Sequence, residues 1–415
     1  MKFRLALAFF IAVSVPTANS VTPIKVSATT PATTFSLGSN SSIVKSIYTS
    51  SGVVLVGTIG ETSNQKLVSG NGLGKTDGFI GKIAQNGALI WGSRLGGGLE
   101  DIATSVIADT DNTFWVLGAS ESSVALTIAE TNVIVINPDS ITVLKETNQN
   151  LGLLTVNIWH ISAKGELIET IKYQSVTPIM PRDLAISPDG LVIVGDLMVA
   201  NGRVGQVLFC NLANVCNVIT KIGARDTSLR GILRNQDGTY FLIGKSADPI
   251  LKTKLVGVVD GVILTLNSKG VLQSLVRSSL HKTSRSWESV SDSYLLGGFA
   301  QSTKISEATI TQFNQRTKPL WSIRISATTS AFTAGNSAIL MSKGGIPRLT
   351  NWKPKSATLL FLEFDNKGAI KAVRSISNGR SPVSISYQRA IGYSIISETG
   401  VENEYSVTFV PSTVK

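Results

Sequence analysis

Apolar residues gather in short runs along this chain, and seven of the runs end at a glycine or a serine at similar intervals. The runs are residues 53–57 (VVLVG), 114–118 (FWVLG), 191–195 (LVIVG), 240–244 (YFLIG), 294–298 (YLLGG), 338–342 (AILMS) and 393–397 (YSIIS). Nearly every position within them is apolar, so we expect strands that are buried on both faces. Repeats of roughly 40–50 residues are typical of propellers and solenoids.

Another apolar strand follows each run after a loop. These third strands of the repeat begin at Asp77, Leu154, Gly205, Asp260, Glu307, Thr358 and Tyr405. Turns such as those ending at Gly87 and Gly270 come next, and glycine supplies the positive φ that tight hairpins require. Short strands at regular spacing, without helical periodicity, indicate an all-β fold.

A fourth strand completes six repeats, whereas the seventh ends after its third strand. The missing strand is found near the other end of the chain, where residues 33–47 (TTFSLGSNSSIVKSI) have the same layout as residues 91–106 (WGSRLGGGLEDIATSV). The sequence therefore predicts a single seven-bladed β-propeller of four-stranded antiparallel blades over residues 33–415. An N-terminal strand that completes the C-terminal blade would close the ring. Residues 21–32 form a Thr/Pro-rich segment ahead of it.

Residues 77–120 resemble the bacterial seven-bladed propeller repeat of the SBBP type. The match rests on Asp77, Phe79, Lys82, Gly87, Leu95, Gly96, Gly97, Asp101, Ala103, Asp109 and Gly118. The resemblance implies a propeller in an exported bacterial protein. It implies no particular activity, because one fold serves many functions.

The first twenty residues have the layout of a signal peptide. Lys2 and Arg4 precede an apolar run over residues 5–15, and Ala18 and Ser20 belong to a small-residue cleavage site. No later stretch approaches the ~20 apolar residues that a transmembrane helix needs. We therefore expect cleavage near Ser20 and a secreted or periplasmic monomer without membrane insertion.

The net positive charge of the chain indicates which class of partner it could bind. Removal of Lys2 and Arg4 lowers the formal net charge from +11 to +9. Such a balance favours a polyanionic partner, for instance an acidic polysaccharide or another cell-envelope polymer. The simpler interpretation is a charge that keeps an ordinary protein soluble, and it is favoured because no run of four or more Lys/Arg occurs. A nucleic-acid partner is not expected.

The two cysteines, Cys210 and Cys216, have five residues between them, and the flanking segments read as the strands of a hairpin. Export permits a disulfide, and pairing across a hairpin brings two cysteines within its reach. The spacing matches no zinc site, and only His160 and His281 could assist. We predict a local disulfide, no metal site and no cofactor.

Long loops should meet at one end of the ring, together with the junctions between blades. They are residues 60–76, 119–153, 245–259 and 343–357, and the second of them contains an apparent hairpin. Loops on a rigid scaffold often carry function. The last one groups Arg348, Trp352, Lys353 and Lys355, an aromatic platform among cations that could stack on a sugar ring. Alternatively, Trp352 packs on the edge of a blade and the lysines are solvated.

Local motifs do not indicate an enzyme. Residues 70–76 look like a phosphate-binding loop, but Ser69 stands where the motif needs glycine and a strand follows where it needs a helix. The first hypothesis is a non-catalytic binding or scaffold module for a glycan, a cell-envelope polymer or a protein, contacted through the long loops. The alternative is an extracellular hydrolase or lyase with a site drawn from several blades, for which Asp101, His281 and Asp292 are candidates. A purely structural surface component is a third possibility.

Overall fold

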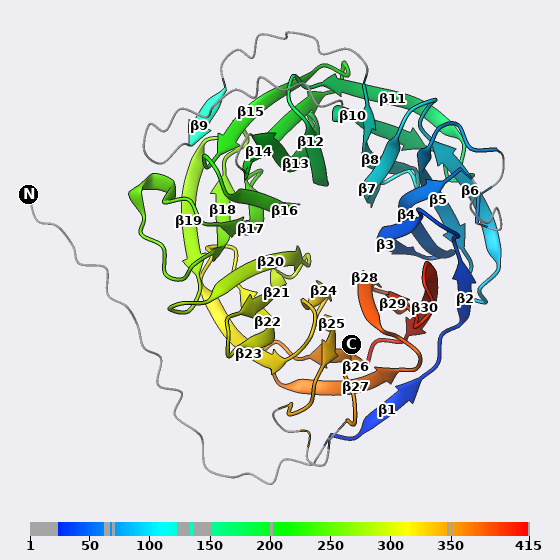
Figure 1. Ribbon diagram of the computed structural model, residues 1–415, viewed down its shortest axis with the longest axis vertical. Helices are drawn as coiled ribbons and strands as arrows, with labels where there is room; N and C mark the ends of the chain where they lie inside the picture. Colours follow the sequence, from blue (N-terminus) through cyan, green and yellow to red (C-terminus); the bar gives the residue numbers. More distant parts are fainter. Residues whose placement is uncertain are drawn as a thin grey trace, which may run out of the picture.

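The computed structural model describes residues 24–61, 67–68, 71–122, 133–136, 152–199, 202–346, 349, 352 and 354–413. Seven sheets stand around a common axis, and the chain passes from blade to blade in sequence order (Figure 1). In each blade the first strand lies nearest to the axis and the other strands follow outwards. This confirms the predicted seven-bladed β-propeller of four-stranded antiparallel blades.

The first four blades share one antiparallel order. From the axis outwards, their strands are β3 (Ser42–Thr49), β4 (Gly52–Gly60), β5 (Thr76–Ile83) and β6 (Leu89–Leu95) in blade 1; β7 (Asp101–Ala108), β8 (Phe114–Glu121), β10 (Leu153–Ile161) and β11 (Leu167–Gln174) in blade 2; β12 (Ile179–Ser187), β13 (Gly190–Val199), β14 (Gly202–Asn211) and β15 (Cys216–Ile222) in blade 3; β16 (Thr227–Arg234), β17 (Tyr240–Ser246), β18 (Asp260–Leu266) and β19 (Leu272–Ser278) in blade 4.

The other three blades continue the same order. Their strands are β20 (Ser284–Val290), β21 (Leu295–Gln301), β22 (Ser306–Phe313) and β23 (Pro319–Ser326) in blade 5; β24 (Phe332–Ala334), β25 (Ser337–Ser342), β26 (Thr358–Phe364) and β27 (Ile370–Ile376) in blade 6; β28 (Ser381–Gln388), β29 (Gly392–Glu398), β30 (Glu404–Val410) and β2 (Thr33–Ser36) in blade 7.

The ring closes where the N-terminal strand joins the last blade. Thr33 of β2 lies opposite Val407 of β30 in an antiparallel pair, and the chain then continues into β3 of blade 1. One continuous segment therefore connects blade 7 with blade 1. The predicted closure is confirmed.

Two short strands add to the four-stranded blades. β1 (Val26–Thr29) pairs in parallel with β27 on the outside of blade 6, although the sequence places this segment ahead of the propeller. β9 (Ile134–Ile136) pairs in parallel with β15 of blade 3. The hairpin expected around β9 otherwise lies outside the described residues, as does the segment expected to be a signal peptide.

The core lies between the faces of neighbouring blades. Every residue of β25 is buried, and β4 is buried at all positions but Thr58. One cluster between blades 1 and 2 joins Val54 of β4 to Val116 of β8 and to Trp159 of β10. Burial of each such aliphatic side chain stabilises the fold by roughly 1.5–3 kcal/mol before entropy is counted. The expectation of second strands buried on both faces is confirmed.

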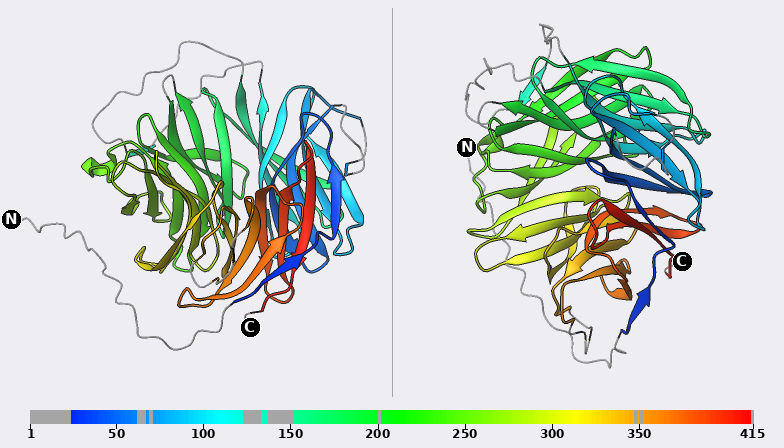
Figure 2. Two further views of the ribbon diagram at one scale, coloured as in Figure 1. Left: turned by 60° about the horizontal axis from the view of Figure 1, so that its bottom comes forward. Right: turned by 45° about the vertical axis from the view of Figure 1, so that its right-hand side comes forward.

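The two ends of the ring carry different kinds of connection between strands. The loops from second to third strands and the junctions between blades lie at one end, which we call the long-loop rim. The tight turns from first to second and from third to fourth strands lie at the other, which we call the hairpin rim. Figure 2 shows the ring from two further sides. Among the described residues, no helix is long and apolar enough to cross a membrane.

Candidate functional site

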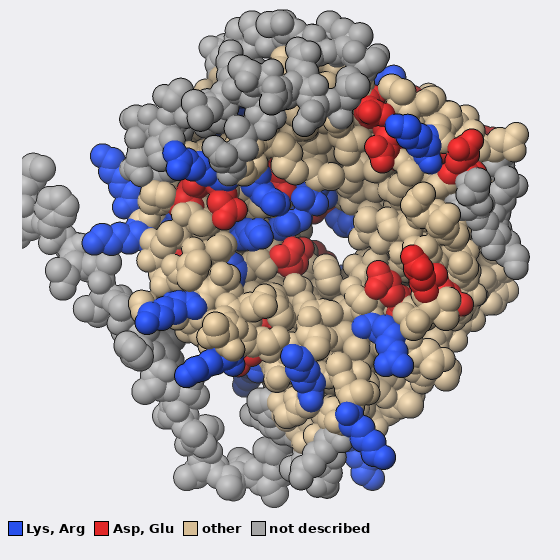
Figure 3. Space-filling view, in the orientation of Figure 1, with Lys and Arg blue, Asp and Glu red and all other residues tan. Residues whose placement is uncertain are grey.

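A channel runs along the ring axis. Its cavity has a volume of about 500 Å³ and is lined by residues from the first strands of all seven blades. The space-filling view shows the opening at the centre of the ring (Figure 3). Because seven strands converge there, one side-chain position per blade suffices to build a ring of groups around a ligand.

Six of the seven first strands contain a β-bulge at the same level. At each bulge one residue is skipped in the pairing with the second strand. A bulge re-aims a side chain and leaves its residue outside the ladder. All six skipped residues line the channel, and they are Val44, Thr104, Arg182, Arg230, Glu288 and Val383.

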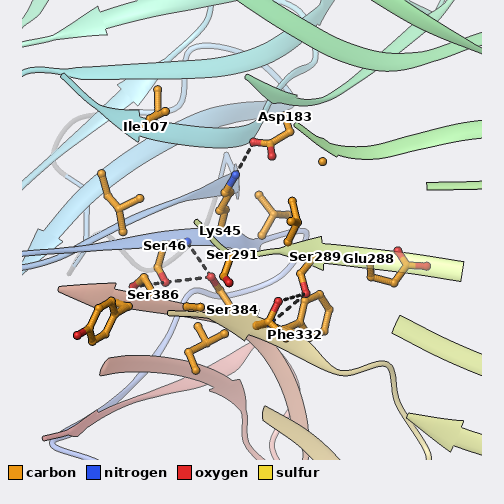
Figure 4. A pocket seen from close by; sticks show the side chains of 18 of the residues that line it. Lys45, Ser46, Ile107, Asp183, Glu288, Ser289, Ser291, Phe332, Ser384 and Ser386 are labelled. Atoms are coloured by element: carbon orange, nitrogen blue, oxygen red, sulfur yellow. Dashed lines mark hydrogen bonds and ion pairs between the residues drawn. The ribbon is translucent and has the colours of Figure 1, made fainter. Parts of the chain in front are cut away.

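The residues that follow the bulges tie the blades together around the channel. Asp183 of β12 accepts a hydrogen bond of 2.7 Å from Ser105 of β7 and also pairs with Lys45 of β3 (Figure 4). On the other side, Ser46 Oγ lies 3.0 Å from Ser384 Oγ of blade 7. Contacts between side chains of different blades fix the channel wall, so a site within it is pre-organised.

Three arginines gather at the end of the channel on the long-loop rim. Arg182 donates to Asp196 at 3.0 Å, and Arg203 lies 3.9 Å from the same carboxylate. Arg230 lies 3.5 Å from Glu288. The three arginine side chains are 21–32% exposed, whereas Asp196 is fully buried. In Figure 3, blue side chains lie on one side of the central opening, with red ones beside them.

Burial sets the electrostatics of this cluster. It lowers the pKa of Arg182, and the neighbouring charge of Arg230 lowers it further, while Asp196 acts in the opposite direction. The charged form of a cation that is poorly solvated and close to another cation is stabilised by an additional anion nearby. The facing wall carries the neutral side chains of Val44, Thr104 and Val383. The mouth can therefore hold an anionic group against the arginines and a less polar part opposite.

A second cavity of about 570 Å³ lies between blades 1 and 2 on the long-loop rim. Asp101 in its wall is buried, and it accepts a hydrogen bond of 2.7 Å from the N–H of Gly97 and another from Ser120. Burial raises the pKa of Asp101. Arg94 also lines this cavity and pairs with the buried Asp77 at 2.7 Å.

The predicted aromatic–cationic group is only partly described. Trp352 is partly buried and packs against the hydrophobic cluster between blades 5 and 6, and its Nε1 has no hydrogen-bond partner among the described residues. Lys355 is exposed. Arg348 and Lys353 lie outside the described residues. Packing of the indole is what the alternative interpretation requires, and a sugar-binding platform here stays a prediction.

The three residues of the enzyme hypothesis do not share a cavity. Asp101 lines the cavity between blades 1 and 2, whereas Asp292 lines the channel and a smaller hollow on the hairpin rim. His281 is exposed at the junction of blades 4 and 5 and lines none of these cavities. The described residues contain no group of three or more His, Cys, Asp or Glu that could hold a metal ion.

The two cysteines occupy opposite positions at the end of the β14–β15 hairpin. Cys210 and Cys216 are paired in the ladder with their Cα atoms 4.0 Å apart, and their sulfur atoms form a disulfide. The bond spans a short turn on the hairpin rim. It closes a local loop and takes no part in the channel.

The channel arginines were not singled out from the sequence, although a signal exists. Aligned on the small or polar residue after the bulge, the first strands read IVKSI, ATSVI, PRDLA, LRGIL, WESVS and PVSIS. The second column then contains Arg182, Arg230 and Glu288. The bulge shifts the register of each first strand against its second strand by one residue. The pattern of apolar runs does not reveal this shift, so the column of channel residues cannot be found from it.

Known family models and curated proteins include no match to this chain. Solved structures with a similar outline include the WD40 domain of Pan2 from Neurospora crassa, at 7% identity and a TM-score of 0.49, covering 90% of this chain and 91% of that one. Sqt1 from Chaetomium thermophilum shows 12% identity, a TM-score of 0.44 and coverage of 92% and 99%. Likenesses at this level carry no information on the ligand of this chain.

Proposed function

We propose that this protein is a non-catalytic binding module that holds an anionic partner at the channel mouth on its long-loop rim. The observation that carries the proposal is the group of Arg182, Arg203 and Arg230, which are all partly exposed. Arg182 and Arg203 share the buried carboxylate of Asp196, and Arg230 lies 3.5 Å from the carboxylate of Glu288. Guanidinium groups recognise carboxylate and phosphate oxygens in paired, charge-assisted hydrogen bonds.

The partner we propose is an acidic polysaccharide or another anionic polymer of the cell envelope. The net positive charge of the chain supports this choice. So does the resemblance of residues 77–120 to the repeats of exported bacterial propellers, together with the signal-like sequence of the first twenty residues. We propose the channel mouth as one contact of the polymer and the loop around Trp352 as a second.

Binding of the purified protein to acidic and neutral polysaccharides, at low and high salt, tests this proposal. The variant R182Q/R230Q should lose acidic-polysaccharide affinity by about tenfold or more, because two charge-assisted contacts are removed. The matched control K164Q/K269Q removes the same charge from two exposed turns on the hairpin rim. Equal losses in both variants would mean that net charge alone attracts the polymer and would refute a site at the mouth.

Trp352→Ala separates the two proposed contacts. If the indole stacks on a sugar ring, the variant should lose binding that persists at high salt, where charge attraction is screened. If Trp352 only packs against the cluster between blades 5 and 6, the variant should lower stability and leave affinity unchanged. Thermal unfolding of each variant, measured beside the binding, distinguishes the two results.

A further inference from the structure

The loop between β17 and β18, together with the junction that leads into blade 5, exposes apolar side chains. We call residues 249–259 with 279–283 the apolar–basic loop. In Figure 2, left, the light green segment that holds the short 3-10 turn η1 (Ile250–Lys252) projects beyond the edge of the ring. Five of its apolar residues expose 56, 36, 48, 58 and 39% of their surface, and they are Leu251, Leu255, Val256, Val258 and Leu280.

All charged side chains within this loop are basic. Lys252, Lys254 and Lys282 are exposed, and residues 249–259 and 279–283 contain no aspartate or glutamate. The acids at its two ends, Asp248 and Asp260, are buried and engaged inside the protein. The projecting surface is therefore apolar and positively charged without a compensating acid.

The loop is held in shape by contacts at its base. Asp260 accepts hydrogen bonds of 3.0 and 2.8 Å from the N–H groups of Val256 and Gly257. Arg277 of β19 reaches Thr253 Oγ1 at 2.9 Å and also donates to the carbonyl of Asp248. These contacts fix the loop in a shape that leaves the apolar side chains exposed to solvent.

The backbone supports the same conclusion. Leu251 and Lys252 have φ of 54° and 57°, a left-handed conformation that is unfavourable for residues other than glycine and that persists only when surrounding contacts enforce it. Ile250 beside them is fully buried and anchors the turn.

Five backbone N–H groups of the loop are hydrogen-bonded within the protein and would stay paired in an apolar environment. The N–H groups of Lys252, Thr253 and Val258 bond to Pro249, Ile250 and Thr283 carbonyls, respectively, and those of Val256 and Gly257 bond to Asp260. Unpaired backbone donors are costly outside water. A convex tip of this kind fits a deformable surface, whereas a protein partner would need a matching hollow.

We propose that the apolar–basic loop docks the protein on an anionic lipid surface. The leucine and valine side chains would enter the boundary between headgroups and acyl chains, and the lysines would lie among the anionic headgroups. Stable peripheral attachment to a membrane needs two contributions, and this loop supplies both: insertion of apolar side chains and attraction of lysines to anionic headgroups. This attachment is independent of the anion site in the channel, which the same rim carries.

Co-sedimentation of the purified protein with phosphatidylcholine vesicles, with and without phosphatidylglycerol, tests the proposal. Binding should require phosphatidylglycerol. The variant L251S/V256S/V258S should lower the partition coefficient by about tenfold or more at physiological salt, where screening leaves insertion as the main contribution. The variant K252E/K254E/K282E should abolish binding at low salt as well.

Matched controls place the same substitutions on the hairpin rim. L212S/V215S/V271S and K164E/K269E/K367E alter exposed residues of the turns between third and fourth strands. These variants should keep vesicle binding within about twofold. Equal loss in loop and control variants would overturn the proposal in favour of general charge attraction. Absence of binding to phosphatidylglycerol vesicles at low salt would also overturn it and point to a protein partner.

Discussion

In blade 1, Arg94 of β6 pairs with Asp77 of β5, and in blade 4, Arg277 of β19 pairs with Asp260 of β18. Both pairs are buried and stand at the long-loop rim. In both blades the aspartate accepts the N–H of the residue four positions earlier, at 3.0 Å. The glycine three positions earlier lies so close to a junction carbonyl that a Cβ would approach its oxygen to 2.0 Å at Gly74 and 2.2 Å at Gly257.

The difference lies in the remaining donors of the two arginines. Arg277 uses them to hold the loop before β18, through Thr253 and Asp248. Arg94 donates to Asp77, and its Nε and Nη2 have no hydrogen-bond partner among the described residues. The same buried pair thus supports a projecting loop in blade 4 and lines an open cavity in blade 1. Loop sequence, and not the repeat itself, decides which of the two is built.

Removal of Arg277 should produce the largest effect. In Arg277→Met, the carboxylate of Asp260 stays buried without its cation and the loop loses two further contacts, so the free energy of unfolding should fall by about 3–5 kcal/mol. Denaturant unfolding measures this change, and vesicle binding should fall with it. Arg324→Met in blade 5 is the control, because its partner Glu307 is partly exposed at 3.5 Å and should contribute below about 1 kcal/mol.

Removal of Arg94 should have a smaller effect. Arg94→Met also leaves its aspartate without a cation, but it relieves two buried donors that lack partners, so we expect a loss of about 1–2 kcal/mol. Unfolding of the two variants side by side provides the comparison. A loss as large as that of Arg277→Met would show that the unpaired donors carry no penalty, and the contrast between the blades would then fail.

The fold was predictable because its signals are local. Continuous apolar runs such as residues 191–195 recur in every blade, turn glycines recur in most of them, and the closing strand shares its pattern with residues 91–106. Strand β1 was not predicted, and neither was the parallel pairing of β9 with β15, since four and three residues in parallel pairing leave no periodic pattern.

The candidate site was less accessible to sequence reasoning. Asp77 and Asp260 each precede glycine and can be read as strand-start caps, but the arginines seventeen positions later become visible only when two blades are compared. Arg182 and Arg230 reach the channel through bulges, which alter the register that a pattern of alternation assumes. Whether the donors of an arginine find partners depends on loop conformation, and no local pattern encodes that.

The open cavity of blade 1 should also respond to pH. Burial raises the pKa of Asp101, which hydrogen bonds from Ser120 and Gly97 only partly offset. The folded protein then binds this proton more tightly than the unfolded chain, so the stabilising contribution is fully present below the unfolded pKa of about 3.9 and is lost as pH rises through the folded value. Relative to Asp101→Asn, the wild-type protein should therefore lose stability from about pH 4 upwards.

Denaturant unfolding of both proteins across the acid and neutral range measures this difference. Ser284 starts β20 as Asp101 starts β7, at the junction that follows blade 4, so Ser284→Ala is the matched control and should differ from wild type by a constant amount at every pH. A difference for Asp101→Asn that is independent of pH, or that changes in favour of the wild type as pH rises, would contradict the assignment. Burial in the cavity between blades 1 and 2 would then not raise the pKa of Asp101.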